Sequence, residues 1–304
     1  MKEAKFAFIG AHTGEHGVAA MCRALGVTRQ GYYQWASRPT SAHDRRDLEL
    51  ARAIGDEYDR SRGIYGAPKV HMMLRRSGIS TSRKRVARIM REYGWRGVSR
   101  GRARRPGAEK RVARSDSSED LVRREFTANG PNQAWFADIT YVRTRQGWLY
   151  LAVVMDVWSR MVVGWSMSER MTAELADDAL RMAIARRHPP AGCIHHSDHG
   201  SQYASLLLGK TMREAGLRPS MGAISSPWDN AVTESLMGCI KAECVHARTF
   251  DSREQAALEL FDYIEGFYNR HRIHSALDWL SPAEYEATRR TQKRPLGGGM
   301  GPVN

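Results

Sequence analysis

The sequence predicts an α/β catalytic domain preceded by a basic, all-helical region. Three consecutive apolar segments rich in β-branched residues, at 132–144, 148–158 and 160–168, are separated by short turns, as expected for successive strands. After them, helical and strand patterns alternate up to about residue 290, which matches a mixed sheet with helices on its faces. Before them, residues 45–125 combine helical periodicity with dense positive charge.

The composition indicates a folded protein with a polyanionic partner. The chain has 304 residues, of which 42% are hydrophobic, and this is enough for two domains with their own cores. Its net charge of +14 and pI near 10.0 predict salt-sensitive binding to a polyanion. A merely soluble basic protein and a membrane-surface binder are the alternatives, but the clustering of the charge favours nucleic acid. No apolar run reaches the roughly 20 residues of a membrane span, so we expect no membrane partner.

Cysteine usage and the N-terminal residues indicate a reducing compartment. The four cysteines (Cys22, Cys193, Cys239 and Cys244) contain no C-x-x-C pair, so we interpret them as free thiols. The histidines complete no zinc-binding pattern with them. The N-terminus has no apolar core followed by a small-residue cleavage site, so we expect no signal peptide and a cytoplasmic location.

The N-terminal arm, residues 1–44, is predicted to contain two short helices. Residues 18–25 have helical periodicity that Gly26 interrupts, and Thr28 is placed to cap a second helix. A helix, a glycine turn and a helix give the outline of a helix-turn-helix. The same pattern fits a small helical hairpin that only packs against a partner, and both interpretations stay open.

Residues 45–100 contain a better helix-turn-helix candidate. Amphipathic helices are expected at 47–58, at 69–76 and from 83 to 93, and Pro68 suits the first turn of the second one. The apolar residues expected to face inward are Leu48, Ala51, Ile54 and Tyr58 in the first helix and Val86, Ile89, Met90 and Tyr93 in the third.

Positive charge is concentrated in and after the third of these helices. From Arg83 to Arg114, thirteen residues are Lys or Arg and two are acidic. A solvated surface helix normally mixes charges of both signs, so this density of one sign favours contact with the DNA backbone. Residues 101–125, rich in Gly, Arg and Ser, are expected to be a basic linker that orders on DNA. The helical residues predicted to bind DNA are Arg83, Lys84, Arg85, Arg88 and Arg91.

Residues 126–290 form the predicted catalytic domain and hold three carboxylates. Asp138 lies within the alternating run WFADITYV, where a charge is costly unless it is paired or metal-bound. Asp198 follows a short apolar run and precedes His-Gly, as at the end of a strand. Glu234 comes four residues after Asn230, a good helix N-cap, and so lies in the first turns of a helix. Each acid alone is more simply a surface or capping residue, but their settings together favour a shared site.

The other elements of this domain complete the alternation. A helix is expected at 172–187, a strand at 193–198, a helix at 202–215 and a strand at 217–221. A long helix is then predicted over 252–270, followed by a short helix that begins after Ser281 with a proline in its first turn.

Three carboxylates from two strands and a helix suit two Mg²⁺ ions. Mg²⁺ prefers oxygen ligands and keeps coordination positions open for water and phosphate oxygens. Two such ions about 3.5–4 Å apart activate the attacking oxygen and stabilise the leaving oxygen in phosphodiester chemistry. Lys241, seven residues after Glu234, is expected to share its helix face and to contact a phosphate.

The spacing and the flanking motifs resemble those of a known enzyme family. Thirty-five residues separate Asp198 from Glu234 (234 − 198 − 1), the D,D(35)E arrangement of retroviral integrases and many transposases. Over residues 45–285 the chain is similar to the catalytic OrfB half of two-frame insertion-sequence transposases of the IS-three family. The motifs that carry this similarity, in the family's order, are WFADITYV, GWLYLAVVMDVWSRMVVGW, HHSDHGSQYAS, SPWDNAVTES and YNRHRIHSALDWLSPAEY.

The resemblance implies a ribonuclease-H-like integrase core, a mixed five-stranded sheet with flanking helices. In it Asp138 and Asp198 come from neighbouring strands and Glu234 from a packed helix. The implied activity is metal-dependent DNA strand cleavage and strand transfer at the ends of the element. The three acids are the implied catalytic residues and ligands of two Mg²⁺ ions, with Mn²⁺ able to substitute. Water and then the liberated 3′-hydroxyl attack in line, so no nucleophilic Ser or Tyr is required.

The resemblance also implies partners. These are the double-stranded DNA of the terminal repeats and of the target, further copies of the chain on DNA, and an upstream OrfA product. That product is expected to act by fusion or association and to supply another helix-turn-helix and a leucine zipper, because no sustained heptad pattern occurs here. The expected location is the cytoplasm of a bacterium, in association with the nucleoid.

Several side residues are interpreted with the resemblance in view. Asn230 is expected to touch DNA as well as cap its helix, and Arg272 either contacts DNA or supports the active-site side. Asp156 is interpreted as structural. The histidines at 195, 196 and 199 are interpreted as packing or supporting residues rather than metal ligands. Residues 291–304 are expected to form a disordered tail.

Two alternatives from other functional classes remain. One is a catalytically silent DNA-binding regulator derived from a transposase, which the complete set of three acids disfavours. The other is a ribonuclease-H-type or junction nuclease, which the long basic N-terminal region and the motif SPWDNAVTES disfavour.

Overall fold

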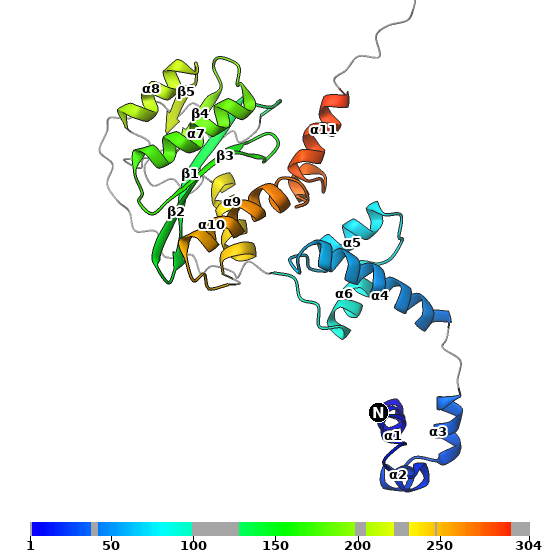
Figure 1. Ribbon diagram of the computed structural model, residues 1–304. Coiled ribbons are helices and arrows are strands. Elements are labelled where there is room, and N and C mark those ends of the chain that lie inside the picture. The colour runs from blue at the N-terminus through cyan, green and yellow to red at the C-terminus, as the bar shows by residue number, and fades with distance from the viewer. Residues whose placement is uncertain are drawn as a thin grey trace, which may run out of the picture.

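The chain folds into an N-terminal helical arm, a second helical module and an α/β domain (Figure 1). In the arm, α1 (Lys2–Ala11), α2 (Val18–Ala24) and α3 (Arg29–Ala36) pack around a small core that includes Ile9. The hydroxyl of Thr28 accepts a hydrogen bond from the amide of Gly31 and caps α3 as predicted. The helix α1 was not predicted from the sequence. The computed structural model describes residues 2–37, 42–98, 128–197, 205–221, 231–246 and 248–292.

The second helical module, residues 42–98, consists of α4 (Ala42–Arg60), α5 (Ala67–Arg76) and α6 (Arg83–Glu92). Pro68 lies in the first turn of α5, and the hydroxyl of Ser82 accepts from the amide of Arg85 to cap α6. The predicted basic linker, residues 101–125, lies outside the described residues.

Two predictions about the module's core and one about a helix start are wrong. Leu48 and Tyr93 were expected to face inward, but each is 51% exposed. Leu50 takes the buried position on α4, and Tyr93 instead stacks on the ring of Trp95 at a centroid distance of 4.8 Å. The helix expected from residue 47 begins at Ala42. Its earlier start was missed because the first turn is polar and carries no apolar periodicity.

The α/β domain is built on a five-stranded mixed sheet in the order β3-β2-β1-β4-β5, which confirms the predicted class. The strands β1, β2 and β3 are antiparallel neighbours, and β4 and β5 are parallel to β1. The strands are β1 (Ala134–Thr144), β2 (Gly147–Asp156), β3 (Val162–Ser168), β4 (Ile194–Ser197) and β5 (Arg218–Met221).

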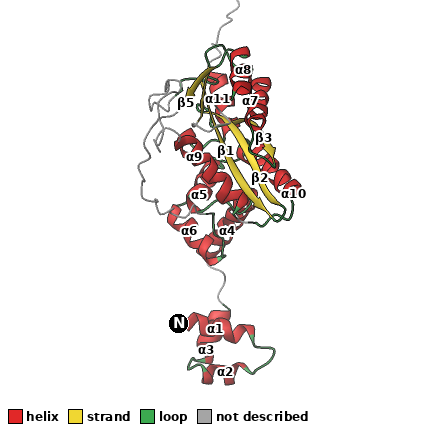
Figure 2. Cartoon of the chain, turned by 90° about the vertical axis from the view of Figure 1, so that its left-hand side faces the viewer, coloured by secondary structure: helices red, strands yellow, loops and turns green. Residues whose placement is uncertain are grey.

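Helices cover both faces of the sheet (Figures 1 and 2). One face packs on α7 (Ala173–Arg187) and α8 (Leu206–Glu214), and the other packs on α9 (Ala231–Ile240) and α10 (Arg253–Phe261). Gly164 of β3 allows α7 to approach closely, because a Cβ atom there would lie 2.2 Å from a backbone oxygen of the helix. Among the described residues, no helix is long and apolar enough to cross a membrane.

Two of the helices on the α9 side change type along their length. The chain continues from α9 into a π-helical segment, Lys241–Val245, and from α10 into another, Asp262–Tyr268. The long helix predicted over 252–270 is therefore only partly α-helical. A short 3₁₀ turn, Ser275–Leu277, then leads to α11 (Pro282–Gln292).

The start of α11 matches its prediction. Ser281 accepts from the amide of Glu284, and its own amide donates to that glutamate, so the two residues form a capping box. The helix continues to Gln292, so the first two residues of the predicted disordered tail, 291 and 292, are helical. The rest of the predicted tail, 293–304, lies outside the described residues.

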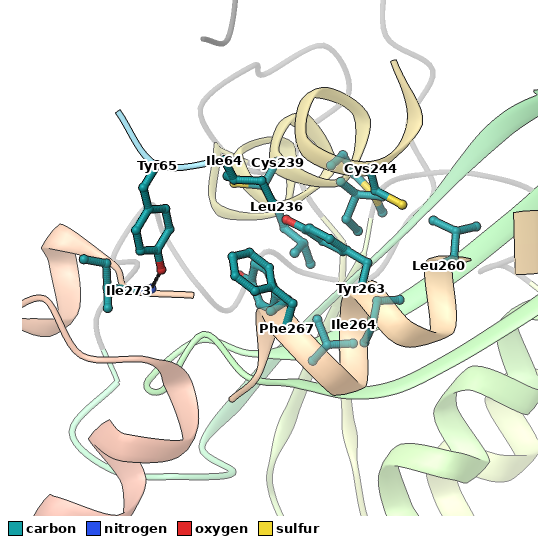
Figure 3. Packing of buried hydrophobic residues seen from close by; sticks show 14 of the residues in the cluster. Ile64, Tyr65, Leu236, Cys239, Cys244, Leu260, Tyr263, Ile264, Phe267 and Ile273 are labelled. Atoms are coloured by element: carbon teal, nitrogen blue, oxygen red, sulfur yellow. Dashed lines mark hydrogen bonds between the residues drawn. The ribbon is translucent and has the colours of Figure 1, made fainter. Parts of the chain in front are cut away.

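The helical module 42–98 and the α/β domain share one hydrophobic cluster (Figure 3). Tyr65 is buried between them. Its hydroxyl donates to the carbonyl oxygen of His271 at 3.0 Å and accepts from the amide of Ile273 at 2.8 Å. Ion pairs at the rim of the junction join Arg62 to Asp262 and Arg76 to Glu284. The module is thus packed against the α/β domain and not only tethered to it.

Candidate active site

Asp138 lies on β1 on the face that α9 covers. Side chains alternate along a strand, so Asp138 points to the same face as Phe136 and Val142. Those two residues belong to the hydrophobic cluster that includes the α9 residues Leu236 and Met237. Asp138 is half-buried, and its carboxylate accepts a hydrogen bond of 2.8 Å from the amide of Ile139.

The strand β4 runs parallel to β1 and ends beside Asp138. The register places His196 opposite Phe136, two residues before Asp138. The last residue of β4, Ser197, directly precedes Asp198 in the sequence. Asp198 itself lies outside the described residues, as does Asn230.

Glu234 is exposed in the first turn of α9, as the sequence analysis expected. One contact and one shared cavity fix the direction of this helix along β1. The ammonium of Lys241 lies 5.2 Å from the centre of the Tyr141 ring. Further along, Val245 and Thr144 line the same cavity of about 470 Å³. The segment that begins with α9 therefore runs in the same direction as β1.

Because α9 and β1 run in the same direction, the two described carboxylates, Asp138 and Glu234, lie towards the same end of these two elements. From Lys241 back to Glu234 is seven residues, or roughly 10 Å along a helix. From Tyr141 back to Asp138 is three residues, or roughly 10 Å along a strand. Asp138 and Glu234 therefore lie at about the same level. No group of three His, Cys, Asp or Glu side chains that could hold a metal is found within the described residues, which exclude Asp198.

Lys241 begins the π-helical segment that continues α9. Its side chain is half-buried and lies against Tyr141, which is itself 55% exposed. The contact of Lys241 with a phosphate stays a prediction.

The described histidines near the site are packing residues. His195 and His196 are both buried on β4. Burial, together with the neighbouring His196, lowers the pKa of His195 to about 4, so its ring is neutral near pH 7. His196 shares a hydrogen bond of 3.0 Å with the hydroxyl of Ser220 and lies against the Phe136 ring. His199 lies outside the described residues.

Asp156 is a structural carboxylate, in agreement with its interpretation from the sequence. It has no exposed surface, burial raises its pKa, and Arg187 lies 3.7 Å away. Its oxygens accept hydrogen bonds from the backbone amides of Asn132, Trp158 and Ser159. These bonds close the turn after β2 and hold it beside the start of β1.

Arg272 lies inside the protein and makes a buried ion pair. It is 4% exposed and donates two hydrogen bonds, of 2.6 and 2.7 Å, to the carboxylate of Glu243. Tyr263 donates a third hydrogen bond to the same carboxylate. Of the two interpretations of Arg272, this geometry favours support of the active-site side over contact with DNA. The Glu243 segment directly continues α9, so the pair anchors the helix that carries Glu234.

Glu243 was not among the residues predicted from the sequence to support the site. A signal was available in principle, because its position after the apolar residues of α9 is one where an unpaired carboxylate would be costly. Its partner is 29 residues away in sequence, so the pattern of a single helix could not reveal it.

The basic residues of α6 fall into two groups. Arg85 and Arg88 form ion pairs with Asp47 of α4, and Arg88 also pairs with Glu92. Arg83, Lys84 and Arg91 are exposed, and none of the three has a carboxylate partner among the described residues. All five were predicted to contact DNA, because the sequence of one helix does not show that Asp47 lies beside it.

Comparisons with known proteins agree with this architecture. The family model described as "Integrase core domain" matches residues 128–227, and a second model of that description matches residues 234–289. An "HTH-like domain" model matches residues 44–103, the helical module. "Transposase InsF for insertion sequence IS3A" of Escherichia coli (strain K12) is 43% identical over 284 residues, which cover 93% of this chain and 98% of the relative.

The chain belongs to the IS3 family of insertion-sequence transposases.

Another relative supports the same membership in this family. The "Insertion element IS600 uncharacterized 31 kDa protein" of Shigella sonnei is 38% identical over 271 residues, 87% of this chain and 97% of the relative. Integrase cores belong to the polynucleotidyl transferases with the DDE motif, so the transposase class and the ribonuclease-H-like core expected from the sequence are confirmed.

Two solved structures are reported for comparison. A chain of the simian T-cell lymphotropic virus intasome in complex with PP2A regulatory subunit B56 gamma is 16% identical, with a TM-score of 0.44, and the match covers 82% of this chain and 79% of that one. The HTLV-2 integrase catalytic core domain in complex with magnesium is 16% identical, with a TM-score of 0.41, and the match covers 53% and 99%. Membership in the IS3 family rests on the sequence matches.

Proposed function

We propose that this IS3-family chain cuts and joins DNA strands at the ends of its element, with Asp138, Asp198 and Glu234 as catalytic residues. The observation that carries this proposal is the common direction of β1 and α9, which sets Asp138 and Glu234 at one level. The end of β4, one residue before Asp198, adjoins the same part of β1.

The residues fit divalent metal ions by their chemistry. Asp138 is a half-buried carboxylate on a strand and Glu234 is an exposed one on a helix that packs against the same sheet, so both offer hard oxygen atoms from regular secondary structure. We propose that these two and Asp198 hold two Mg²⁺ ions, with Mn²⁺ able to substitute. When bound, such ions activate an attacking oxygen and neutralise charge on the phosphate and the leaving oxygen.

The chain's own contribution is to position the ions and the DNA. Asp138 is fixed by β1, and Glu234 is fixed by α9 and by the anchor of Glu243 on Arg272. The proposed sequence is hydrolysis of one phosphodiester to free a 3′-hydroxyl, followed by in-line attack of that hydroxyl on a second phosphodiester. No covalent bond between protein and DNA forms in either step.

The proposed DNA contacts follow the charge on the surface. The exposed residues Arg83, Lys84 and Arg91 of α6 are proposed to bind the backbone of the terminal repeat. Lys241 is proposed to bind a phosphate near the cut site, and Asn230 is retained as a proposed contact outside the described residues. Arg85, Arg88 and Arg272 are proposed to act indirectly, by holding α6 and α9 in place.

The finer expectations about assembly and domains are also proposals. We propose that several copies act together on DNA and that an upstream OrfA product joins them by fusion or association. We propose the domain limits 1–44, 45–100, 101–125, 126–290 and 291–304, with the last shortened by the observed end of α11 at Gln292. A cytoplasmic, nucleoid-associated location stays a prediction.

The test is strand cleavage and joining with labelled DNA that carries the element's end, in Mg²⁺ and in Mn²⁺, with and without the fused upstream frame. Asp138→Asn, Asp198→Asn and Glu234→Gln are each expected to lower the rate at least a thousandfold, because charge stabilisation of this kind is worth several kcal/mol. Matched controls are Asp178→Asn and Glu214→Gln, which alter exposed acids on α7 and α8 and are expected to keep full activity. Equal activity in the three triad variants and the controls would overturn the assignment.

A further inference from the structure

A cavity of about 500 Å³ lies where the helical module 42–98 meets the integrase core. The module contributes Lys69, from the first turn of α5, and Gly97. The core contributes Arg160, from the turn between β2 and β3, as well as Ser235 of α9, His274 and Trp279. We call this cavity the junction pocket. Its volume is in the range of about 300–1,000 Å³ that ligand sites occupy.

The junction pocket is positively charged. Its lining includes three permanent cations, Lys69, Arg160 and Arg272, and one carboxylate, Glu243, so the formal sum is +2 (3 − 1). The Glu243 carboxylate is held by two hydrogen bonds from Arg272 and one from Tyr263. Lys69 and Arg160 are half-buried at the wall, which weakens the screening of their charges by water.

The pocket adjoins the proposed active site. Ser235, one of its lining residues, directly follows Glu234 on α9. The part of the lining that the helical module contributes includes the first turn of α5, and the amide dipoles of that turn add positive potential there. A DNA strand that passes from the helical module to Glu234 would therefore cross this pocket.

We propose that the junction pocket binds a backbone phosphate of the DNA strand that is cut. This inference rests on the proposed function and names a contact within it. A phosphodiester carries one negative charge and exposes oxygens that accept hydrogen bonds from an ammonium, a guanidinium and a hydroxyl. Lys69, Arg160 and Ser235 supply one of each, and they come from both parts of the protein. The phosphate thereby links the module that binds DNA to the helix that carries Glu234.

The variants are chosen to remove charge with little loss of packing. The ammonium of Lys69 lies 4.7 Å from the centre of the Tyr65 ring, so Lys69→Met keeps an apolar stem against that ring. Arg160→Gln removes the second cation. Lys69→Arg keeps the charge and serves as the conservative variant. Lys210→Gln is the matched control, because Lys210 is 66% exposed on α8, away from the pocket.

The measurement is the affinity of the full chain for labelled element-end DNA as a function of salt concentration. Each phosphate contact that is lost is expected to reduce the slope of log K against log salt by about 0.9. Lys69→Met and Arg160→Gln should each show this reduction and weaken binding roughly tenfold at low salt, since the lost hydrogen bonds are to charged groups. Lys69→Arg should restore the wild-type slope, and Lys210→Gln should not change it.

The contrary results are distinct from failure of the proposed function. If wild type binds and cuts element-end DNA while Lys69→Met and Arg160→Gln keep its slope and affinity, the pocket proposal is overturned and the function stands. A loss of affinity without a change of slope in correctly folded variants would assign the residues a purely structural role and would also overturn it. If poly-glutamate competes with DNA for the wild type, and Lys69→Met and Arg160→Gln leave the slope of DNA affinity against salt unchanged, the pocket would be assigned to an acidic protein partner and the proposal would be overturned. If wild type neither binds nor cuts DNA, both proposals fail.

Discussion

At the scale of single residues, the buried pair of Glu243 and Arg272 decides how the helix that carries Glu234 is held. Burial alone would raise the pKa of Glu243, but the hydrogen bonds and charge of Arg272 outweigh burial and lower it. The carboxylate is therefore ionised in the folded protein. The Glu243 side chain is only 7% exposed, so a lone charge left in this place would be poorly solvated.

Removing one partner of this pair is expected to destabilise the fold strongly. Arg272→Met should lower the free energy of unfolding by about 3–5 kcal/mol, because it leaves the Glu243 carboxylate buried and unpaired. The double variant Arg272→Met with Glu243→Gln should lose less free energy of unfolding than the single variant Arg272→Met. Thermal or urea unfolding measures both. A single variant as stable as wild type would contradict the role assigned to the pair.

His195 predicts a dependence of stability on pH. Its pKa is about 4 in the folded protein because of burial and the adjacent His196, and about 6.5 in the unfolded chain. The unfolded chain therefore binds more protons between these two values, and stability should fall as pH decreases from 6.5 towards 4. The slope from this residue is at most about 1.4 kcal/mol per pH unit. Urea unfolding of wild type and His195→Gln across this range should show a shallower dependence in the variant.

At the scale of elements, α6 shows how a uniform run of positive charge is divided by its surroundings. One side of the helix packs through Val86, Ile89 and Met90. Between that side and the solvent, Arg85 and Arg88 meet Asp47 of α4, which neutralises part of their charge. The remaining cations at 83, 84 and 91 face outward. Only this outer group is available to a DNA backbone.

The two groups on α6 should respond differently to substitution. Lys84→Gln and Arg91→Gln are each expected to lower DNA affinity several-fold and to reduce its salt dependence, with no change in the unfolding midpoint. Arg85→Gln should instead lower stability by about 1 kcal/mol, because one ion pair with the half-buried Asp47 is lost. DNA binding by fluorescence anisotropy, together with thermal unfolding, separates the two effects. Identical behaviour of Lys84→Gln and Arg85→Gln would contradict this division.

At the scale of the whole molecule, the helical module 42–98 and the integrase core behave as one packed body. They share a hydrophobic cluster, the Tyr65 hydroxyl joins the loop at 271–273, and ion pairs lie at the rim of the junction. The proposed domain boundaries at 100 and 126 therefore divide the sequence, but the module and the core on either side of them pack against each other. The arm 2–37 has a separate small core.

This packing predicts that the module stays attached when the chain is cut. A protease site inserted after residue 108 and then cleaved should leave fragments that co-migrate in size-exclusion chromatography. Adding Tyr65→Phe should weaken the association by about 1–3 kcal/mol, because it leaves the buried amide of Ile273 and the partly buried carbonyl of His271 without their partner. Separation of the wild-type fragments after cleavage would show that the shared cluster does not hold the module in place.

The sequence by itself determined the class of sheet, most of the elements and the family. Period-two runs such as WFADITYV and helix caps such as Thr28 are local signals, so they can be found without knowing any tertiary contact. Similarity over most of the chain likewise marked Asp138, Asp198 and Glu234 from the order of the motifs.

Only the tertiary structure decided which charged residues face solvent and which hold the protein together. Arg85 meets an acid 38 residues away, Arg272 meets one 29 residues away, and Tyr65 bonds to backbone more than 200 residues away. The periodicity of one helix or strand reports which side is apolar, but not what the other elements bring to that side. For the same reason, the junction pocket and the shared level of Asp138 and Glu234 became visible only once the module and α9 were in place.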